Sequence, residues 1–171
     1  KKLVVVPNGI PPLPTPATNP HELKTFLKIP SGGLVVGSVG RLSRQKGHIY
    51  LLQAAKILAP RFPLVRYVIA GSGELENSLS REASRLGIEN LVVFAGHADK
   101  IEDYYSIFDL VVFPSLWEGM PYAMLEAMSA GKPIAGSDVG GLGEVVRREK
   151  CGLCVPPENP QALAEAIAVL L

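Results

Sequence analysis

The chain has 171 residues, 47% of them hydrophobic, so it is long enough for one domain with a core and too short for two ordinary domains. Its 17 basic and 16 acidic side chains give a net charge of +1, which excludes the global positive field that nucleic acid binding needs. No apolar run approaches the roughly eighteen residues of a membrane span, and no secretory leader is recognisable, so we expect a cytoplasmic domain.

The two ends of the sequence favour a piece of a larger protein. The first residue is Lys1 rather than an initiator methionine, and Leu171 lies inside an unfinished amphipathic pattern. We therefore expect a single domain over residues 1–171 that has been separated from a longer chain.

Short apolar runs rich in Val and Ile alternate with segments of helical periodicity, which is typical of parallel strands joined by crossover helices. Strands are expected at Leu3 to Val6, Leu34 to Gly40, Arg66 to Ala70, Leu91 to Ala95, Leu110 to Phe113, Pro133 to Gly136 and Leu153 to Val155. Helices are expected at Gly47 to Leu58, Glu74 to Leu86, Ile101 to Ile107, Pro121 to Ala130, Gly143 to Arg147 and Pro160 to Leu171. The alternation predicts an α/β fold with a Rossmann-like, doubly wound parallel sheet.

The segment from Ile10 to Pro20 carries five prolines and reads as an extended connector. In a doubly wound sheet, ligands bind in the crevice beyond the carboxyl ends of the strands. The segments that follow the predicted strands are therefore the candidates for a site.

The only two cysteines, Cys151 and Cys154, have a C-x-x-C spacing that invites a zinc or redox interpretation. The histidines His21, His48 and His97 lie in separate segments, however, and none has metal-ligand spacing to the pair. The pair also reads as a turn that enters a short strand, whereas a thioredoxin-like motif lies at a helix N-terminus. We expect two ordinary buried thiols and no metal site.

A basic loop, Arg41 to Gly47, follows the strand that ends at Gly40. Arg41 offers a planar fork for bidentate phosphate contact, Lys46 a mobile point charge, and the next helix start unpaired amides. These groups predict a diphosphate clamp. Taken by itself, the segment is also compatible with a solvated basic turn.

Two glutamates follow the predicted strand Leu110 to Phe113. Glu118 lies just ahead of a helix in whose first turn we expect Pro121, and Glu126 lies about one and a half turns in, so both carboxylates can reach a ligand across the helix start. Carboxylates accept paired hydroxyls, as in ribose and hexose, and the nearby amides favour an anion. Alternatively, Glu126 is a surface helix residue and Glu118 an acid that the helix dipole favours.

Two glycine-rich loops also follow strands. Gly71-Ser72-Gly73 has the setting of a dinucleotide fingerprint, but Glu76 stands where the third glycine belongs, which disfavours a nicotinamide site. The loop lets a base or phosphate approach, or is a simple tight turn. Asp138 to Glu144 either shapes a pocket rim or forms a turn before an acidic helix start.

His97 follows another strand and faces the same predicted crevice. A lone histidine of this kind is more often structural than catalytic, so we assign it no proton transfer.

Taken in order, these motifs resemble the carboxy-terminal domain of the group 1 class of GT-B-fold glycosyltransferases. The motifs that carry the resemblance are Val5-Val6-Pro7-Asn8-Gly9-Ile10, Val39 through Gly47, Ala70-Gly71-Ser72-Gly73, Phe94-Ala95-Gly96, Pro114 through Met128 and Gly140-Gly141-Leu142-Gly143-Glu144. They span nearly the whole chain. Gly143 departs from the family, which often has proline there, and we expect it to loosen a turn.

The resemblance implies a role for each matching residue. Arg41 and Lys46 would hold the diphosphate of a nucleotide sugar and stabilise the leaving nucleoside diphosphate, and Glu118 would hold hydroxyls of the donor sugar. Glu126 would take the ribose hydroxyls. The remaining implied contacts to the donor come from Gly40, Gly71, His97, Gly119, Met120, Tyr122 and Ala123.

The resemblance also implies a retaining mechanism by front-face attack, with no metal and no cofactor besides a UDP-, GDP- or ADP-sugar substrate. The acceptor site of a GT-B enzyme belongs to its amino-terminal domain, through which the parent protein can associate peripherally with a membrane. We expect this chain alone to bind nucleotide and to transfer nothing. A non-catalytic nucleotide-sugar-binding module and a sugar-nucleotide epimerase of the same fold are the alternatives.

Overall fold

The computed structural model describes residue 4 and residues 6–171, and its strands form one parallel sheet in the order β3-β2-β1-β4-β5-β6. The strands are β1 (Val35–Val39), β2 (Arg66–Ala70), β3 (Val92–Gly96), β4 (Leu110–Phe113), β5 (Ile134–Ser137) and β6 (Gly152–Val155). The helices are α1 (Pro20–Phe26), the short 3-10 helix η1 (Arg44–Lys46), α2 (His48–Leu58), α3 (Glu76–Arg85), α4 (Ile101–Ile107), α5 (Tyr122–Ser129), α6 (Gly140–Glu149) and α7 (Pro160–Leu170).

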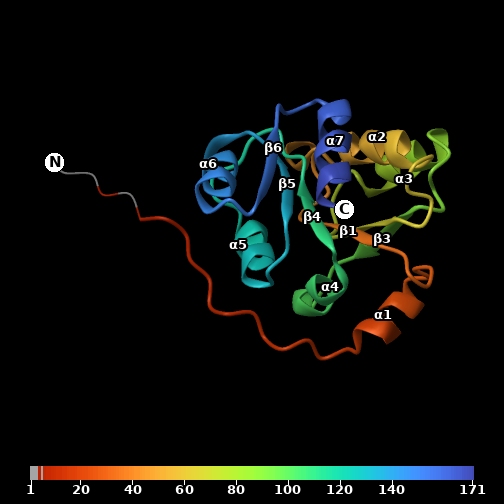
Figure 1. Cartoon of the computed structure of the whole chain (residues 1–171), viewed down its shortest axis with the longest axis horizontal. Coiled ribbons are helices and arrows are strands. Elements are labelled where there is room, and N and C mark those ends of the chain that lie inside the picture. The colour runs from red at the N-terminus through yellow and green to blue at the C-terminus, as the bar shows by residue number, and fades with distance from the viewer. Residues whose placement is uncertain (1–3, 5) are drawn as a thin grey trace.

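Helices cover both faces of the sheet and divide the core into two layers (Figure 1). Helices α2, α3 and α7 pack on one face against strand residues such as Val36 and Leu110, whereas α1, α4, α5 and α6 pack on the other against Val35 and Val111. Neighbouring strand residues thus alternate between the two layers, as the pleat requires. The doubly wound α/β fold predicted from the sequence is confirmed.

The strand order reverses at the centre of the sheet, between β1 and β4. Strand β1 pairs in parallel with β2 on one side and with β4 on the other, where Val36 lies opposite Leu110. The chain therefore leaves β1 and β4 at the same edge of the sheet, and their crossovers turn to opposite sides. This is the position at which such sheets form a ligand crevice.

Six of the predicted strands occur, with ends that differ by at most one residue. The strand expected at Leu3 to Val6 falls on Leu3 and Val5, which lie outside the described residues, so that prediction stays open. The connector from Ile10 onward is extended, as its prolines indicate, and Figure 1 shows it running along the outside of the domain.

The prediction missed α1, because Pro20 was assigned to the connector. Proline is tolerated at the first position of a helix, where its missing amide has no intrahelical partner. Here the Asn19 side chain caps the helix by accepting a hydrogen bond from the His21 amide at 2.9 Å. Just before this cap, Thr18 Oγ1 donates to Asp103 Oδ2 at 2.6 Å and fastens the connector to α4.

The predicted start of α6 at Gly143 was also wrong, because Gly140 and Gly141 were assigned to the preceding loop. The helix begins at Gly140, and Gly143 lies buried inside it rather than loosening a turn. A Cβ at Gly143 would overlap Asp138 Oδ1, the end of a half-exposed side chain, and would lie 3.2 Å from Asp138 Cα, so Asp138 would have to shift to admit a larger residue. Glu144 consequently lies in the second turn and not near the helix start.

Within the described part of the chain, no helix combines the length and the apolar character that crossing a membrane requires.

The contact between β5 and β6 generates a stability prediction. A Cβ at Gly152 would overlap the backbone carbonyl of Ile134, its partner in β5. Because β5 is hydrogen-bonded to strands on both sides, its backbone cannot shift locally to relieve the overlap. We expect Gly152→Ala to lower the free energy of unfolding by at least about 2 kcal/mol. Denaturant unfolding measures this, with Gly9→Ala as control because open space surrounds Gly9. Equal stability of the two variants would contradict the packing argument.

Candidate functional site

A cavity of about 380 Å³ opens beyond the carboxyl ends of β1, β2 and β3. Its lining consists of Val39, Gly40, Arg41, Ala70, Gly71, Ser72, His97, Ala98, Ile101 and Glu126. The structure thus brings together five residues that the sequence singled out, from three strand ends and from α5. They are Gly40, Arg41, Gly71, His97 and Glu126.

Beside this cavity, an ion pair joins the loop after β1 to the loop after β4. Lys46 Nζ pairs with Glu118 Oε1, and the two side chains are only 19% and 7% exposed. The Lys46 stem lies against Gly40 of the cavity wall, where a Cβ would be 3.4 Å from Lys46 Cε. Lys46 is therefore a partly buried cation that is paired with a carboxylate.

Ser115 adds a second contact to the same carboxylate. The residue follows β4 and is 1% exposed, and its hydroxyl donates to Glu118 Oε1 at 3.1 Å. The carboxylate thus receives two donors on one oxygen and is held in a single orientation. The sequence analysis quoted the Pro114-Ser115 strand end but gave Ser115 no role.

Backbone contacts hold the two loops together around the ion pair. The Leu116 amide donates to the Gln45 carbonyl at 2.8 Å, and the Gln45 side chain donates to the Trp117 carbonyl at 3.0 Å. Gly47 has a φ of 63° and lies so close to the Pro114 carbonyl that a Cβ would overlap it. Glycine is required here both for the left-handed conformation and for the contact.

The start of α6 and the N-terminal segment complete the surroundings of Glu118. A Cβ at Gly140 would overlap the Glu118 carbonyl, and one at Gly141 would lie 2.5 Å from the Gly119 carbonyl. The Asn8 side chain donates to the Met120 carbonyl at 2.8 Å. The glycine-rich segment after β5 therefore packs on the Glu118 loop rather than forming a free turn.

Glu126 lies one turn into α5, not one and a half, because the helix begins at Tyr122. Pro121 precedes the helix as its cap and not within the first turn. The Glu126 carboxylate lines the cavity and accepts a hydrogen bond from the hydroxyl of Tyr105 at 3.1 Å. Tyr105 belongs to α4, and no motif in the sequence linked it to Glu126.

The four remaining predicted contacts lie outside the cavity lining. Gly119 and Met120 belong to the loop that carries Glu118, and Tyr122 and Ala123 form the first turn of α5. The first amides of a helix have no intrahelical partner, so those of Tyr122 and Ala123 remain suitable donors to an anion. The Tyr122 side chain is 58% exposed.

His97 and Arg41 lie at the open side of the cavity. Both side chains are exposed, and His97 Nε2 lies 3.6 Å from Asp99 Oδ1, whose side chain is itself 93% exposed. An exposed pair of this kind contributes little energy. The arrangement leaves both side chains accessible to a ligand.

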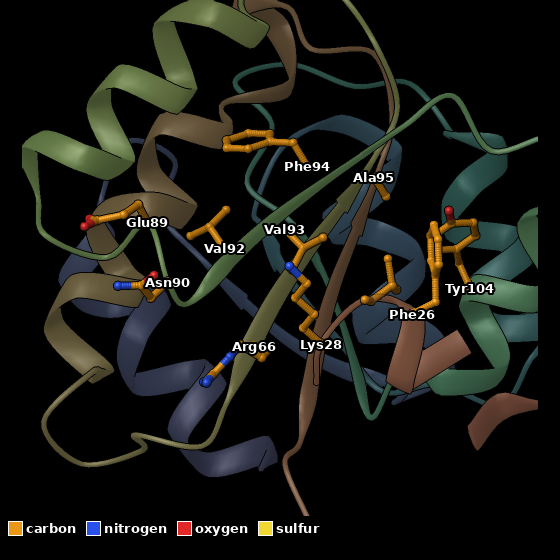
Figure 2. A pocket seen from close by; sticks show the side chains of 11 residues that line it. Phe26, Lys28, Arg66, Glu89, Asn90, Val92, Val93, Phe94, Ala95 and Tyr104 are labelled. Atoms are coloured by element: carbon orange, nitrogen blue, oxygen red, sulfur yellow. The ribbon is translucent and has the colours of Figure 1, made fainter. Parts of the chain in front are cut away.

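A larger cavity of about 660 Å³ lies elsewhere, along the edge strand β3 (Figure 2). Figure 2 shows Phe26 and Tyr104 on its α1 and α4 side, and Glu89 and Asn90 on the opposite side. None of the predicted site residues lines it. The smaller cavity is the candidate site because it lies beyond the carboxyl ends of the strands and because Arg41 and Glu126 line it.

The two cysteines are free thiols, as expected, and they are partly rather than completely buried. Burial raises the pKa of Cys151 above its ordinary value and that of Cys154 to about 11. Both therefore remain thiols at neutral pH and are poor nucleophiles. Across residue 4 and residues 6–171, no cluster of three or more His, Cys, Asp or Glu side chains is arranged to hold a metal ion.

His48, which follows the clamp loop directly, is an unexpected buried titratable group. It is 2% exposed, and its Nδ1 has no hydrogen-bond partner within the described part of the chain. Burial, and secondarily the charge of Lys46, lowers its pKa to about 4. His48 is therefore neutral at pH 7 and adds no positive charge to the site.

Comparisons with known proteins agree with this architecture. The family model for glycosyl transferases group 1 matches residues 21–171. The Escherichia coli UDP-Gal:alpha-D-GlcNAc-diphosphoundecaprenol alpha-1,3-galactosyltransferase is 35% identical over 171 residues, covering 97% of this chain and 44% of that protein. The chain spans 33% to 44% of the length of three curated relatives.

Solved structures show the same fold. The Anabaena protein HepE in complex with UDP-glucose superposes with a TM-score of 0.78 at 30% identity, over 88% of this chain and 42% of that one. The C-terminal domain of a group 1 family glycosyl transferase from Francisella tularensis has a TM-score of 0.77 at 25% identity, over 91% and 84%.

The buried His48 predicts a pH dependence of stability. Unfolded histidine titrates near 6.5 and folded His48 near 4, so the unfolded state binds the extra proton in between. The stability that depends on a neutral His48 is fully present above pH 6.5. About 3 kcal/mol of the free energy of unfolding is lost as the pH falls from there toward 4. Over the same pH range, we expect the free energy of unfolding of His48→Gln to fall by about 3 kcal/mol less than that of the wild type. Denaturant unfolding at several pH values measures the slope, and the exposed His21→Gln should keep the wild-type slope.

Proposed function

The chain belongs to the glycosyl transferases group 1 family and has the Rossmann-like half of a GT-B fold, and we propose that it is the donor-binding domain of a retaining glycosyltransferase. The observation that carries the proposal is the pairing of Lys46 with Glu118 beside a cavity that contains Arg41 and Glu126. Cations for a diphosphate and carboxylates for sugar hydroxyls thus adjoin at the carboxyl edge of the sheet.

In this proposal, Arg41 and Lys46 bind the diphosphate of a nucleoside-diphosphate sugar. The guanidinium of Arg41 suits a bidentate contact with phosphate oxygens, and Lys46 supplies a charge held in place by its packing on Gly40. Negative charge grows on the leaving diphosphate as the glycosidic bond breaks, so the two cations stabilise the transition state more than the ground state. Two protein cations can provide this stabilisation without a metal.

Donor binding then requires Lys46 to exchange partners. The ammonium is paired with Glu118 in this structure, so a diphosphate competes with the carboxylate for it. A donor that carries a sugar offers hydroxyls to the Glu118 carboxylate in return, whereas a plain nucleoside diphosphate does not. The ion pair therefore favours the complete donor over the nucleotide product.

The nucleoside would lie across the rest of the cavity. Glu126 accepts the ribose hydroxyls, and the base lies between Gly71 and His97, both of which line the cavity. The amides of Gly119, Met120, Tyr122 and Ala123 complete the contacts to the sugar and the phosphates. The relative HepE was crystallised with UDP-glucose, which supports a nucleotide sugar as the ligand class.

For the chemical step, we propose front-face attack with retention of the anomeric configuration. The acceptor hydroxyl attacks the anomeric carbon, the bond from that carbon to the leaving phosphate oxygen breaks, and the proton passes to that phosphate. Glu118 is held by Lys46 and Ser115, which suits a binding role better than that of a nucleophile. The acceptor would be bound by an amino-terminal domain, so the chain alone binds nucleotide and transfers nothing.

Nucleotide binding by the 171-residue chain tests the proposal. A thermal-shift panel of UDP, GDP, ADP and their glucose conjugates should raise the melting temperature for at least one base, because a ligand that binds only the folded state stabilises it by RT ln(1 + [L]/Kd). Arg41→Ala and Glu126→Ala should each weaken that binding roughly tenfold, as expected for a lost hydrogen bond to a charged group.

The matched control is Arg44→Ala. Arg44 is an exposed cation of the same loop but does not line the cavity, so its removal should leave the affinity within about twofold. Undiminished binding in both site variants would refute their assigned roles, and no shift with any nucleotide would refute the donor site.

A further inference from the structure

The hydroxyl of Tyr105 lies between two acceptors of α5, one of which is the carboxylate of Glu126, a residue that lines the candidate site. It is 2.8 Å from the Ala123 carbonyl and 3.1 Å from Glu126 Oε2. The side chain is 1% exposed, and its ring packs edge-on against Phe108 with centroids 5.8 Å apart. The position of the hydroxyl is therefore fixed by packing in α4 and not by solvent.

The chemistry of these neighbours makes Tyr105 a donor. A carbonyl oxygen and a carboxylate oxygen both only accept, so the single phenolic proton is shared between them. Burial, and then the charge of Glu126, raises the pKa of Tyr105 far above its ordinary value. The hydroxyl consequently keeps its proton at any pH at which the protein is folded.

Glu126 needs such a restraint because a glutamate side chain has several rotamers, and fixing them costs free energy on ligand binding. Within residue 4 and residues 6–171, Tyr105 is the one hydrogen-bond donor to its carboxylate. The bond uses one lone pair of Oε2 and leaves the rest of the carboxylate for the cavity that Glu126 lines. An oriented carboxylate matches paired hydroxyls better than a mobile one.

We propose that Tyr105 is a positioning residue that fixes the Glu126 carboxylate for the donor ribose and so makes the site selective for ribonucleotides over 2′-deoxyribonucleotides. This inference rests on the proposed function. It adds to that function a selectivity for the ribose that does not depend on the base. The residue responsible belongs to α4, a helix that carries none of the family motifs quoted above.

The experiment is a binding cycle on the 171-residue chain with Tyr105→Phe. The probes are UDP, GDP and ADP, each compared with its 2′-deoxy counterpart by isothermal titration calorimetry. We expect wild type to prefer the ribonucleotide about tenfold, the usual size of a hydrogen bond to a charged group. In Tyr105→Phe, the ribonucleotide should bind about fivefold more weakly and the deoxynucleotide within about twofold of wild type.

The control is Tyr104→Phe, which removes the same hydroxyl from the same helix. Tyr104 lines the cavity along β3 and not the candidate site, so its variant should keep the wild-type preference. If Tyr105→Phe does not fold, Tyr105→Met replaces it, since the flexible methionine side chain fills irregular space without a hydroxyl.

Three results separate the explanations. A preference that collapses only in the Tyr105 variant supports the inference. Equal weakening of both nucleotides, or none, overturns it and leaves Tyr105 a structural residue, while the donor site itself stands. If no nucleoside diphosphate binds wild type, the proposed function is wrong and the inference falls with it.

Discussion

The loops that follow β1 and β4 emerge side by side because these two strands pair in parallel at the centre of the sheet, with Val36 opposite Leu110. Their crossovers then turn to opposite faces, so no helix fills the space between the loops. This arrangement brings Lys46 to Glu118 and lets Gln45 bond to Leu116 and Trp117. Sheet topology therefore places the backbone segments that carry these charges next to each other.

Both site carboxylates are held by hydroxyl groups from neighbouring elements. Ser115 contacts Glu118, and Tyr105 contacts Glu126. A carboxylate that is already oriented loses less conformational entropy when a ligand binds, and its charge acts in a partly dehydrated environment where electrostatic interactions are stronger. The structure therefore contains an organised set of acceptors. In the proposed function, the Lys46 ammonium would exchange Glu118 for the diphosphate of the donor.

The sequence predicted the alternation of strands and helices and five of the residues that line the cavity, because both follow from hydrophobic periodicity and from position at strand ends. It missed α1, where Pro20 occupies the first helical position, at which its missing amide needs no partner, and where Asn19 caps the helix. It also missed Tyr105 and Ser115, since a buried hydroxyl resembles any core residue in a sequence until its acceptor is known. The low pKa of His48 was missed for a similar reason, because it results from burial, which depends on tertiary packing.

The glycines around the site have a consequence for how specificity can change. At Gly47, Gly71 and Gly140, one backbone segment touches another directly, with no side chain between them. The relative positions of the loops are therefore defined by main-chain atoms. Substitution of a side chain at another position of the loops does not remove these contacts. Exposed positions such as Tyr122 can vary freely on this frame. A scaffold of this kind permits diversification of the ligand it accepts while the chemistry at its centre is inherited unchanged.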